Sequence, residues 1–402
     1  MTRTLSLLAA TAAFPVLAMA EPVEQGPRNV PEFEPAFENQ TRAPAMDSGV
    51  SLEVEEIASG LSHPWGIEVL PDGSYLVTER SGALRHVGED GTVGEPIAGV
   101  PEVLAQDQGG LLDVALAEDF AESRTVFLTY AKPMEGGMSA TAAAKGRLSE
   151  DLRELTGVTD IFVQDPPAPN AKHFGSRIVP HGDYVFITTG EHFTDRLRQY
   201  AQDLDKTYGK IVRVTLDGEA PGDNPFAGEE GARPEIWSYG HRNIQGAAIR
   251  PSTGELWGLE HGPKGGDELN RIEAGGNYGW PLVSYGEKYS GQPVGSGEHS
   301  QEGVVEPRYY WDPVIAPGGF AWMEGETFAD WEGDVIAASL KPGGIVRLDL
   351  EDETVVGEER FLRDELGRVR DIEIAPDGAI LAITDQDNGR LVRLTPGTQA
   401  MD

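Results

Sequence analysis

The 402-residue chain contains no cysteine. Disulfides, thiolate metal sites, iron–sulfur clusters and a cysteine nucleophile are therefore excluded. Any metal ion that the protein holds must rest on oxygen or imidazole ligands. The sequence also lacks an H-E-x-x-H zinc motif, a G-x-S-x-G serine-hydrolase motif and a phosphate-binding loop, which removes three common enzyme classes.

Basic residues are scarce. Lysine and arginine number 32 against 67 aspartates and glutamates, which gives a formal net charge of −35. Such a negative field repels phosphate backbones and anionic lipids, so we exclude nucleic acid as a partner and disfavour anionic membranes. No stretch after the N-terminus approaches the ~20 apolar residues of a transmembrane helix, so no integral membrane segment is expected.

The first 20 residues have the pattern of a secretory signal. Arg3 precedes an apolar run over residues 5–17, and Ala18-Met19-Ala20 forms a small-x-small cleavage site. An ordinary apolar helix is the alternative. We expect a periplasmic protein with a signal peptide over residues 1–20, followed by a poorly ordered tether over residues 21–50, which are rich in proline, glutamate and asparagine.

Helical periodicity is nearly absent, and short strand-like segments bounded by turns recur instead. Fifty glycines and 28 prolines suit many tight turns. Six repeats over about 350 residues have a period that is typical of propeller blades. We therefore predict an all-β fold, a six-bladed β-propeller over residues 51–402. The repeats contain these turns: Leu70-Pro71-Asp72-Gly73, Glu118-Asp119-Phe120, Pro180-His181-Gly182-Asp183, Arg250-Pro251-Ser252-Thr253-Gly254, Glu332-Gly333-Asp334 and Ala375-Pro376-Asp377-Gly378.

Three local predictions concern single segments. The strand from Ser51 to Ile57 is expected to close the ring by joining the last blade, which would remove an open sheet edge. Residues 138–155 are the one place where a helix-bearing insertion is expected. Residues 385–389 begin like an EF-hand calcium loop but lack the glutamate at the twelfth position, so we interpret them as a hairpin turn.

Propellers bind ligands where loops from several blades meet at the mouth of the central channel, so functional residues should be loop-borne and scattered in sequence. His173 lies in a turn-rich loop and could act as a general base, because the pKa of imidazole is close to the working pH. A satisfied polar residue is the alternative. Residues 240–246 place one cation and three neutral polar side chains between two glycines, which favours an anionic or carbonyl-rich ligand.

Acidic, glycine-rich loops follow at residues 260–268 and 275–281. Calcium prefers carboxylate and backbone carbonyl oxygens, so these loops favour a calcium site, with a merely solvated acidic loop as the alternative.

Basic residues stand out later in the chain. Lys341 lies in a glycine-rich loop, and Arg368 and Arg370 could form a carboxylate clamp, because residues i and i+2 of an extended segment point the same way. Salt bridges to neighbouring acidic residues are the alternative.

Together these segments strongly resemble the PQQ-dependent soluble aldose sugar dehydrogenases, relatives of the soluble quinoprotein glucose dehydrogenases. The resemblance runs from about Gly60 to Leu394 and implies a six-bladed propeller, in agreement with the repeats. It also implies an oxidoreductase that converts the anomeric carbon of aldose sugars to lactones, with hydride transfer to PQQ. Eight motifs in order carry it: His63-Pro64-Trp65-Gly66, Gln108-Gly109-Gly110-Leu111-Leu112-Asp113, His173-Phe174-Gly175-Ser176-Arg177, Gly240-His241-Arg242-Asn243, His261-Gly262-Pro263-x-Gly265-Gly266-Asp267-Glu268, Asn277-Tyr278-Gly279-Trp280-Pro281, Ser339-Leu340-Lys341 and Arg368-Val369-Arg370-Asp371.

The resemblance implies roles for single residues. His173 matches the base that takes the proton of the anomeric hydroxyl, Arg242 also matches a residue that stabilises charge on the quinone, and Asp267 matches an acidic residue near the base. PQQ has three carboxylates and an ortho-quinone, so it requires cationic partners. The residues that match cofactor contacts are Gln108, Arg242, Asn243, Tyr289, Lys341, Arg368 and Arg370.

Calcium is the second implied cofactor. In the glucose dehydrogenases it bridges PQQ and protein through carbonyls that match Gly262 and Pro263, and a structural calcium of the aldose branch matches Glu268 and the carbonyl of Tyr278. The implied partners are an aldose sugar and an unidentified electron acceptor, a cytochrome or the quinone pool.

Two departures from the glucose dehydrogenases lie beside the reacting centre. His261 stands where they have glutamine, and Lys172 stands where they have aspartate. Two other functions remain open on a six-bladed propeller. One is a calcium-dependent lactonase or hydrolase, which would need a channel metal with several acidic or asparagine ligands. The other is a ligand-binding propeller without enzymatic activity, which would have no reason for a histidine beside a cationic clamp.

Overall fold

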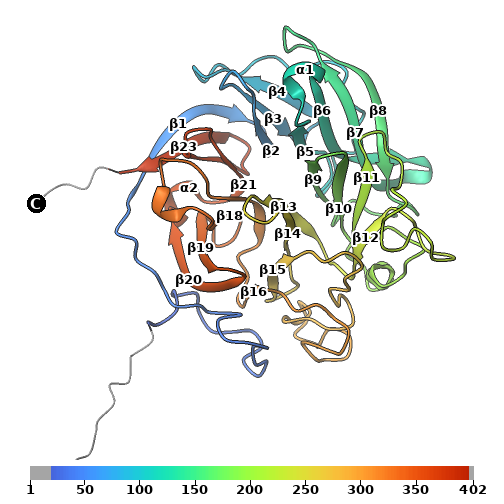
Figure 1. Cartoon of the computed structure of the whole chain (residues 1–402), viewed down its shortest axis with the longest axis vertical. Coiled ribbons are helices and arrows are strands. Elements are labelled where there is room, and N and C mark those ends of the chain that lie inside the picture. Colours follow the sequence, from blue (N-terminus) through green and yellow to red (C-terminus); the bar gives the residue numbers. More distant parts are fainter. Residues whose placement is uncertain (1–19, 398–402) are drawn as a thin grey trace, which may run out of the picture.

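The computed structural model describes residues 20–397 and forms the predicted six-bladed β-propeller (Figure 1). The predicted signal peptide therefore lies outside the described residues, except for Ala20. Five sheets have four strands and one has three. The first strands of neighbouring sheets contact one another in a closed ring around the channel. These inner strands are β2 (Pro64–Val69), β5 (Leu111–Leu116), β9 (Gly175–His181), β13 (Ile244–Arg250), β17 (Pro317–Trp322) and β21 (Val369–Ile374).

In every blade the inner strand joins the second strand through one of the six predicted turns, which confirms the repeats. The second strands are β3 (Tyr75–Glu79), β6 (Thr125–Met134), β10 (Tyr184–Thr189), β14 (Glu255–Glu260), β18 (Val335–Ser339) and β22 (Ile380–Thr384). The third strands are β4 (Ala83–Val87), β7 (Met138–Leu148), β11 (Lys210–Thr215), β15 (Asp267–Arg271), β19 (Ile345–Glu351) and β23 (Gly389–Pro396).

The ring closes as predicted, because β1 pairs antiparallel with β23 and completes the last blade. This pairing joins the two ends of the propeller and covers the edge of β23. The segment 385–389 is the expected hairpin turn between β22 and β23. The outermost strands of the five four-stranded blades are β8 (Leu155–Val163), β12 (Ile236–Tyr239), β16 (Tyr309–Trp311), β20 (Thr354–Phe361) and β1 (Leu52–Leu61).

The expected helix-bearing insertion at residues 138–155 is wrong. Residues 138–148 form β7, which pairs with both β6 and β8. Its alanines favour a helix in isolation, but they are fully buried between neighbouring strands, and this tertiary pairing overrides their propensity. The α-helices of the described residues are two single turns, α1 (Phe120–Ser123) and α2 (Arg363–Leu366). Between residues 20 and 397, no helix has the length and apolarity needed to cross a bilayer.

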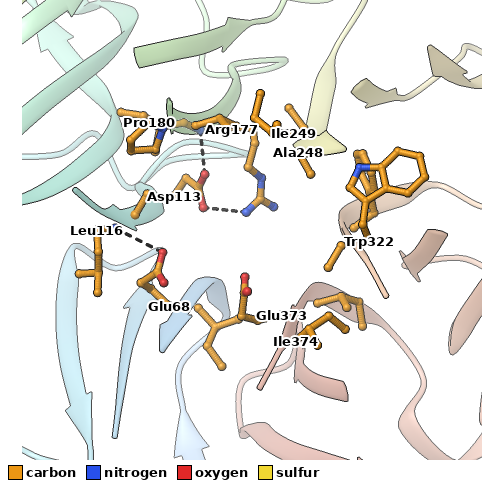
Figure 2. A pocket seen from close by; sticks show the side chains of 18 of the residues that line it. Glu68, Asp113, Leu116, Arg177, Pro180, Ala248, Ile249, Trp322, Glu373 and Ile374 are labelled. Carbon is orange, nitrogen blue, oxygen red and sulfur yellow. Dashed lines mark hydrogen bonds and ion pairs between the residues drawn. The ribbon is translucent and has the colours of Figure 1, made fainter. Parts of the chain in front are cut away.

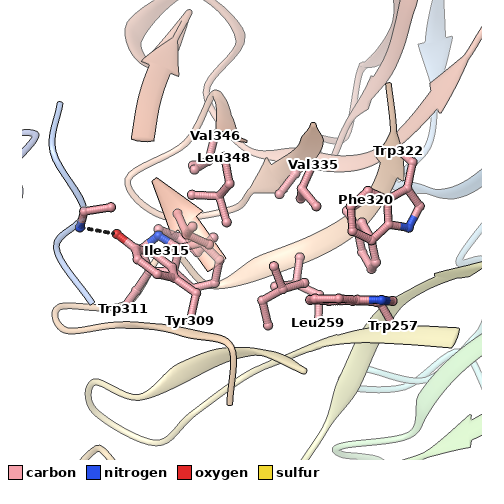
Figure 3. Close-up of a cluster of buried hydrophobic side chains, with 14 residues drawn as sticks. Trp257, Leu259, Tyr309, Trp311, Ile315, Phe320, Trp322, Val335, Val346 and Leu348 are labelled. Carbon is pink, nitrogen blue, oxygen red and sulfur yellow. Dashed lines mark hydrogen bonds between the residues drawn. The ribbon is translucent and has the colours of Figure 1, made fainter. Parts of the chain in front are cut away.

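The hydrophobic core lies between adjacent blades. Figure 3 shows one of these layers, a cluster that contains Trp257 of β14, Trp311 of β16, Trp322 of β17 and Val335 of β18. The indoles of Trp257 and Trp322 meet edge to face, with ring centroids 5.3 Å apart. Each blade therefore buries its two faces against its neighbours, and the channel-facing ends of the inner strands remain available for polar residues.

The segment for which composition predicted a poorly ordered tether, residues 21–50, instead packs against the propeller. Ala43 is fully buried in the layer of Figure 3, where its amide donates a 3.0 Å hydrogen bond to the hydroxyl of Tyr309. Two residues later Ala45 forms a bridge with Glu358 of β20. The segment thus obtains hydrogen bonds from the outer parts of two blades, which its low apolar content alone does not reveal.

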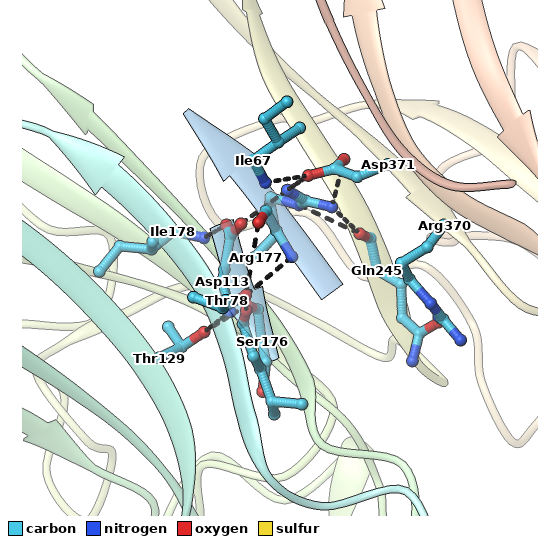
Figure 4. Close-up of polar contacts among 12 residues, drawn as sticks. Ile67, Thr78, Asp113, Thr129, Ser176, Arg177, Ile178, Gln245, Arg370 and Asp371 are labelled. Atoms are coloured by element: carbon cyan, nitrogen blue, oxygen red, sulfur yellow. Dashed lines mark hydrogen bonds and ion pairs between the residues drawn. The ribbon is translucent and has the colours of Figure 1, made fainter. Parts of the chain in front are cut away.

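A polar plug fills the channel at the third position of the inner strands (Figure 4). All five N–H donors of Arg177 are used: they bond the carboxylates of Asp113 and Asp371 at 2.7–3.0 Å and the backbone carbonyl of Gln245 at 3.0–3.1 Å. The carboxylate of Asp371 also accepts the amide of Ile67. The plug therefore connects inner strands from different blades and divides the channel into two ends.

Gly319 of β17 completes the plug through its lack of a side chain. A Cβ at this position would lie 1.7 Å from Oδ1 of Asp371 and 2.6 Å from a guanidinium nitrogen of Arg177. Only glycine allows β17 to approach the ion pairs this closely. We call the channel end where the inner strands begin the upper mouth, and the end where they finish the lower mouth.

Candidate active site

Six of the nine predicted catalytic and cofactor residues lie at the upper mouth, because they directly precede or begin the inner strands. Gln108 lies before β5, His173 before β9, and Arg242 and Asn243 before β13. Arg368 and Arg370 flank the first residue of β21. Since the inner strands run in the same direction around the channel, residues that are far apart in sequence meet here.

His173 is held in place by its neighbours. Its φ of +50° lies in the left-handed region, which non-glycine residues seldom adopt, and its amide donates a 2.8 Å hydrogen bond to Oε1 of Gln108. Its Nδ1 lies 3.1 Å from Oε1 of Glu191. An ionised Glu191 accepts the Nδ1 proton, and the Nε2 lone pair is then the basic position of the ring.

The electrostatic surroundings keep this imidazole neutral. Burial and the nearby cations Arg242, Arg198 and Lys172 hold the pKa of His173 well below its ordinary value. Burial raises the pKa of Glu191 to about 7, so that this carboxyl titrates near neutrality. A neutral imidazole with a carboxyl group on Nδ1 is the arrangement that a general base requires.

Glu191 reaches His173 because of strand register. In the hairpin of β9 and β10, Gly175 pairs with Thr189, so residues 173 and 191 lie opposite each other just beyond the paired ends. Gly190 permits the close approach, since a Cβ there would lie 1.9 Å from the carbonyl oxygen of His173.

Arg242 and Asn243 come from the next blade. The amide of Arg242 donates a 2.7 Å hydrogen bond to Glu260, its Nη1 donates to the carbonyl of His261, and its guanidinium lies 5.3 Å from the ring centre of Trp280. Oδ1 of Asn243 accepts a hydrogen bond from the backbone amide of Gly175, two residues after His173. Arg242 is therefore fixed toward the mouth, and Asn243 braces the loop of the base.

Arg368 and Arg370 share one acceptor, Asp385, at 2.8 and 2.7 Å. Nδ1 of His63 approaches the other carboxylate oxygen at 2.9 Å. Burial alone would raise the pKa of Asp385. The charge of Arg370 and the hydrogen bonds from Arg368 and His63 outweigh burial and hold this pKa well below its ordinary value. The predicted clamp and its alternative, a local salt bridge, are thus both present, since one carboxylate balances two guanidiniums.

Three predicted residues neither precede nor begin an inner strand. Lys341 is exposed in a separate cavity of about 530 Å³ beside the N-terminal segment. Tyr289 is 66% exposed and lines a cavity of about 190 Å³ together with Arg242. Asp267 is buried with a pKa raised to about 7 by burial, and its two oxygens accept the amides of residues 262 and 316 at 2.7 Å. Glu191, rather than Asp267, is the carboxyl group in contact with His173.

The four predicted metal residues meet around one small cavity. Gly262, Pro263, Glu268 and Tyr278 all line a space of about 20 Å³, which is the size of a single ion or water. Within residues 20–397, no donor bonds the carbonyls of Gly262 and Pro263. Burial and the neighbouring Glu260 raise the pKa of Glu268 well above its ordinary value. Two carboxylates beside free carbonyls suit a hard cation such as calcium, which would offset their repulsion.

The upper mouth also fits an anionic cofactor. The buried Nε atoms of Arg242 and Arg370 find no hydrogen-bond partner among residues 20–397. Such donors are costly unless a ligand accepts from them. Arg368 and Arg370 have one carboxylate between them, so positive charge is left for a ligand. The donor set therefore suits a polycarboxylate such as PQQ.

Comparison with known proteins agrees with this geometry. The family model for glucose and sorbosone dehydrogenases matches residues 61–393. The chain belongs to this family. It is 42% identical over 350 residues to aldose sugar dehydrogenase YliI of Escherichia coli, which covers 86% of this chain and 93% of that protein.

Solved structures give the same result. The apo form of the soluble aldose sugar dehydrogenase from E. coli superposes with a TM-score of 0.83 at 41% identity, covering 86% of this chain and all of that one. The PQQ-bound form of the aldose sugar dehydrogenase from Streptomyces coelicolor superposes with a TM-score of 0.72 at 28% identity, covering 88% and 99%. The expected family and fold are confirmed.

Sequence reasoning missed three residues of this glucose and sorbosone dehydrogenase site. Glu191 has a sequence signal, since it and His173 are placed almost symmetrically about the turn at residues 182–183. Asp385 was considered only as part of a hairpin turn. Gln245 joins the site to the plug, because its Oε1 contacts both Arg370 and His261 while its backbone carbonyl accepts from Arg177.

Proposed function

We propose that the chain is a periplasmic, PQQ-dependent dehydrogenase that oxidises the anomeric carbon of aldose sugars to lactones. One observation carries this proposal: a neutral, carboxyl-oriented His173 lies beside Arg242 in a mouth whose other wall carries Arg368 and Arg370. A base next to a polycarboxylate-binding wall is what sugar oxidation with PQQ requires.

The residues of the chain have distinct tasks in this reaction. Nε2 of His173 takes the proton of the C1 hydroxyl. At the same time the C1–H bond breaks and the hydrogen departs with its electron pair as hydride, so that C1 becomes the carbonyl carbon of the lactone. When bound, PQQ supplies the two-electron acceptor for this hydride. Arg242 stabilises the negative charge that develops beside it, and Arg368 and Arg370 hold the cofactor carboxylates.

Calcium belongs to the same proposal. The cavity lined by Gly262, Pro263, Glu268 and Tyr278 would hold one ion, and this ion would keep the loop beside Arg242 and His261 in place. Export depends on residues 1–20, and reoxidation depends on a cytochrome or the quinone pool. Relatives named as aldose sugar dehydrogenases and a PQQ-bound relative support the substrate class and the cofactor.

The channel centre argues against the lactonase alternative. A calcium-dependent propeller hydrolase needs a metal there with several acidic or asparagine ligands. In this chain a guanidinium occupies that place, with all its donors bonded. A binding-only propeller does not account for a histidine paired through Nδ1 with a buried glutamate.

Reconstitution tests the proposal. The purified chain is incubated with PQQ and calcium, and its absorption spectrum is recorded before and after addition of glucose. We expect sugar-dependent reduction of the bound cofactor, turnover with an artificial acceptor, and a lactone as product. Tight PQQ binding without any change on adding a panel of aldoses would support the binding-only alternative, and lactone hydrolysis without PQQ would support the hydrolase.

A further inference from the structure

The lower mouth contains a second cavity, of about 660 Å³, which has no part in the site described above (Figure 2). Its walls are the second halves of the inner strands, whereas the active-site residues precede or begin the same strands. The plug of Arg177 and Asp113 forms the boundary. A volume of this size is in the range of small-molecule sites.

The polar part of the wall is anionic. Glu68 and Glu373 project into the cavity from neighbouring inner strands, and Figure 2 shows both carboxylates beneath the plug. Glu68 accepts a 3.3 Å hydrogen bond from the amide of Leu116. Within residues 20–397, no lysine or arginine forms an ion pair with either carboxylate. The one guanidinium of the wall, Arg177, is already shared by two aspartates, so it forms no ion pair with Glu68 or Glu373.

The rest of the wall is apolar, apart from the indole N–H of Trp322, which donates no hydrogen bond within the described residues. Trp322 is 4% exposed, lines the cavity and has an indole Nε1 without a hydrogen-bond partner in the described chain. Figure 2 shows this nitrogen on the side of the ring that faces the cavity. A buried, unbonded N–H is costly unless something accepts from it. The apolar lining includes Ile67, Ile249, Phe320 and Ile374.

We propose that the lower cavity binds an organic ammonium compound that carries an oxygen acceptor, such as an amino alcohol. Its cationic group lies against Glu68 and Glu373, its hydrocarbon body against the apolar wall, and its oxygen accepts from Nε1 of Trp322. An inorganic cation fits less well, because among residues 20–397 no group of three acidic or histidine side chains is arranged to hold a metal. Burial and the neighbouring Glu373 raise the pKa of Glu68, and burial and Asp371 raise the pKa of Glu373; a bound cation would favour the charged form of both carboxyls.

Calorimetric titration of the purified mature chain tests this proposal. The probes are 6-aminohexan-1-ol, hexylamine and hexan-1-ol, which share one alkyl chain and differ in charge and oxygen. We expect the amino alcohol to bind most tightly, hexylamine several-fold more weakly and hexanol not measurably. If hexan-1-ol bound as tightly as the amino alcohol, binding would be due to apolar contact alone and the proposal would be overturned. Absence of amino alcohol binding would overturn it as well.

Variants locate the binding. Glu68→Gln with Glu373→Gln is expected to weaken amino alcohol binding at least tenfold, while Glu122→Gln with Glu332→Gln, which removes the same charge from exposed positions outside the cavity, leaves it unchanged. Trp322→Phe keeps an aromatic wall and should abolish only the advantage of amino alcohol over hexylamine, so it serves as a second test if the double variant does not fold. Equal losses in both double variants would overturn the proposal.

Two further titrations separate this site from the active site and from a metal site. Protein loaded with PQQ should bind the amino alcohol with the same affinity, because the plug separates the two mouths. Complete displacement of the amino alcohol by stoichiometric calcium chloride would overturn the proposal in favour of a metal site. The titrations do not require turnover, so their failure would leave the proposed sugar oxidation untouched.

Discussion

The two mouths of the channel are built from opposite ends of the same six strands, yet the unshared ionisable side chains are basic at one mouth and acidic at the other. The upper mouth presents Arg242, Arg368 and Arg370, whereas the lower cavity presents Glu68 and Glu373. A chain with a net charge of −35 thus concentrates cations at one end of its channel. The net charge therefore determines the long-range electrostatic field of the protein, whereas the charged side chains at each mouth determine which ligand can bind there.

The mouths also differ in how the sequence encodes them. The repeated turns follow the inner strands and lie at the lower mouth, while five of the eight motifs that do not repeat precede or begin the inner strands and lie at the upper mouth. Repetition preserves the blade, because each turn connects the same pair of strands. Variation supplies chemistry, because each blade contributes a different residue to one shared site.

The largest expected effect separates the mouths by catalysis. His173→Ala should lower aldose turnover by about 10²–10⁴-fold, the usual contribution of a positioned base, while the variant still folds and binds PQQ. Turnover is measured with glucose and an artificial acceptor, and folding by thermal unfolding. Glu373→Gln at the lower mouth is the matched control and should keep wild-type turnover. Near-wild-type turnover in His173→Ala would place the base elsewhere.

The next effect compares two members of the cationic wall. Arg370 is buried and Arg368 is half-exposed, although both bond Asp385. Arg370→Ala should therefore weaken PQQ binding by about 100-fold, and Arg368→Ala by about tenfold, because loss of a buried charge partner costs more than loss of an exposed one. Fluorescence titration of the apoprotein with PQQ measures both, with Arg393→Ala as a control on the outer side of the same blade. Equal, small losses would mean that the pair serves only Asp385.

Most of the fold could be predicted from sequence because its signals are local. Turns at regular intervals marked the blades, and the N-terminal strand at β1 closed the ring as expected. The failures are tertiary. The alanine-rich β7 is a strand because β6 and β8 flank it, and residues 21–50 pack on the propeller through hydrogen bonds to the outer parts of two blades and burial of Ala43. Neither partner is visible in the segment itself.

The same distinction holds for the candidate site. His173 and Arg242 lie in unusual loops, so composition singled them out. Glu191 became visible only through the register of β9 and β10, and Asp385 only through the approach of Arg370 from the neighbouring strand. Asp267 was named through the family resemblance alone, and the structure shows that its carboxylate accepts hydrogen bonds from two backbone amides. Contact between strands, rather than residue type, decides these assignments.

Calcium binding at the upper mouth should have a smaller effect, which is measured as thermal stability. Added calcium should raise the melting temperature of the wild type by roughly 5 °C at saturating concentration, since binding to the folded state alone stabilises it. Glu268→Gln should remove most of this shift, because it deletes a carboxylate from the 20 Å³ cavity. The exposed Glu302→Gln is the control and should retain the full shift. An unchanged shift in Glu268→Gln would place the ion elsewhere.

The smallest expected effect contrasts the pH responses of the two mouths. Burial and the neighbouring Asp371 raise the pKa of Glu373 to about 8, and burial and Glu373 raise the pKa of Glu68. Raising the pH from 6 to 9 therefore charges these carboxyls, while an aliphatic amine stays protonated, so amino alcohol binding should strengthen by about tenfold. The other titratable or charged groups that face them are Asp113, Glu118, Arg177, His181, Glu324 and Asp371.

Calorimetry at pH 6, 7.5 and 9 measures this change. Glu68→Gln with Glu373→Gln should bind weakly at every pH, because amides do not titrate. The base at the upper mouth should behave differently, since the pKa of His173 is already well below its ordinary value and the imidazole is neutral across this range. If amino alcohol affinity in the wild type is flat from pH 6 to 9, the two carboxyls are not its partners, and the electrostatic contrast between the mouths does not govern binding.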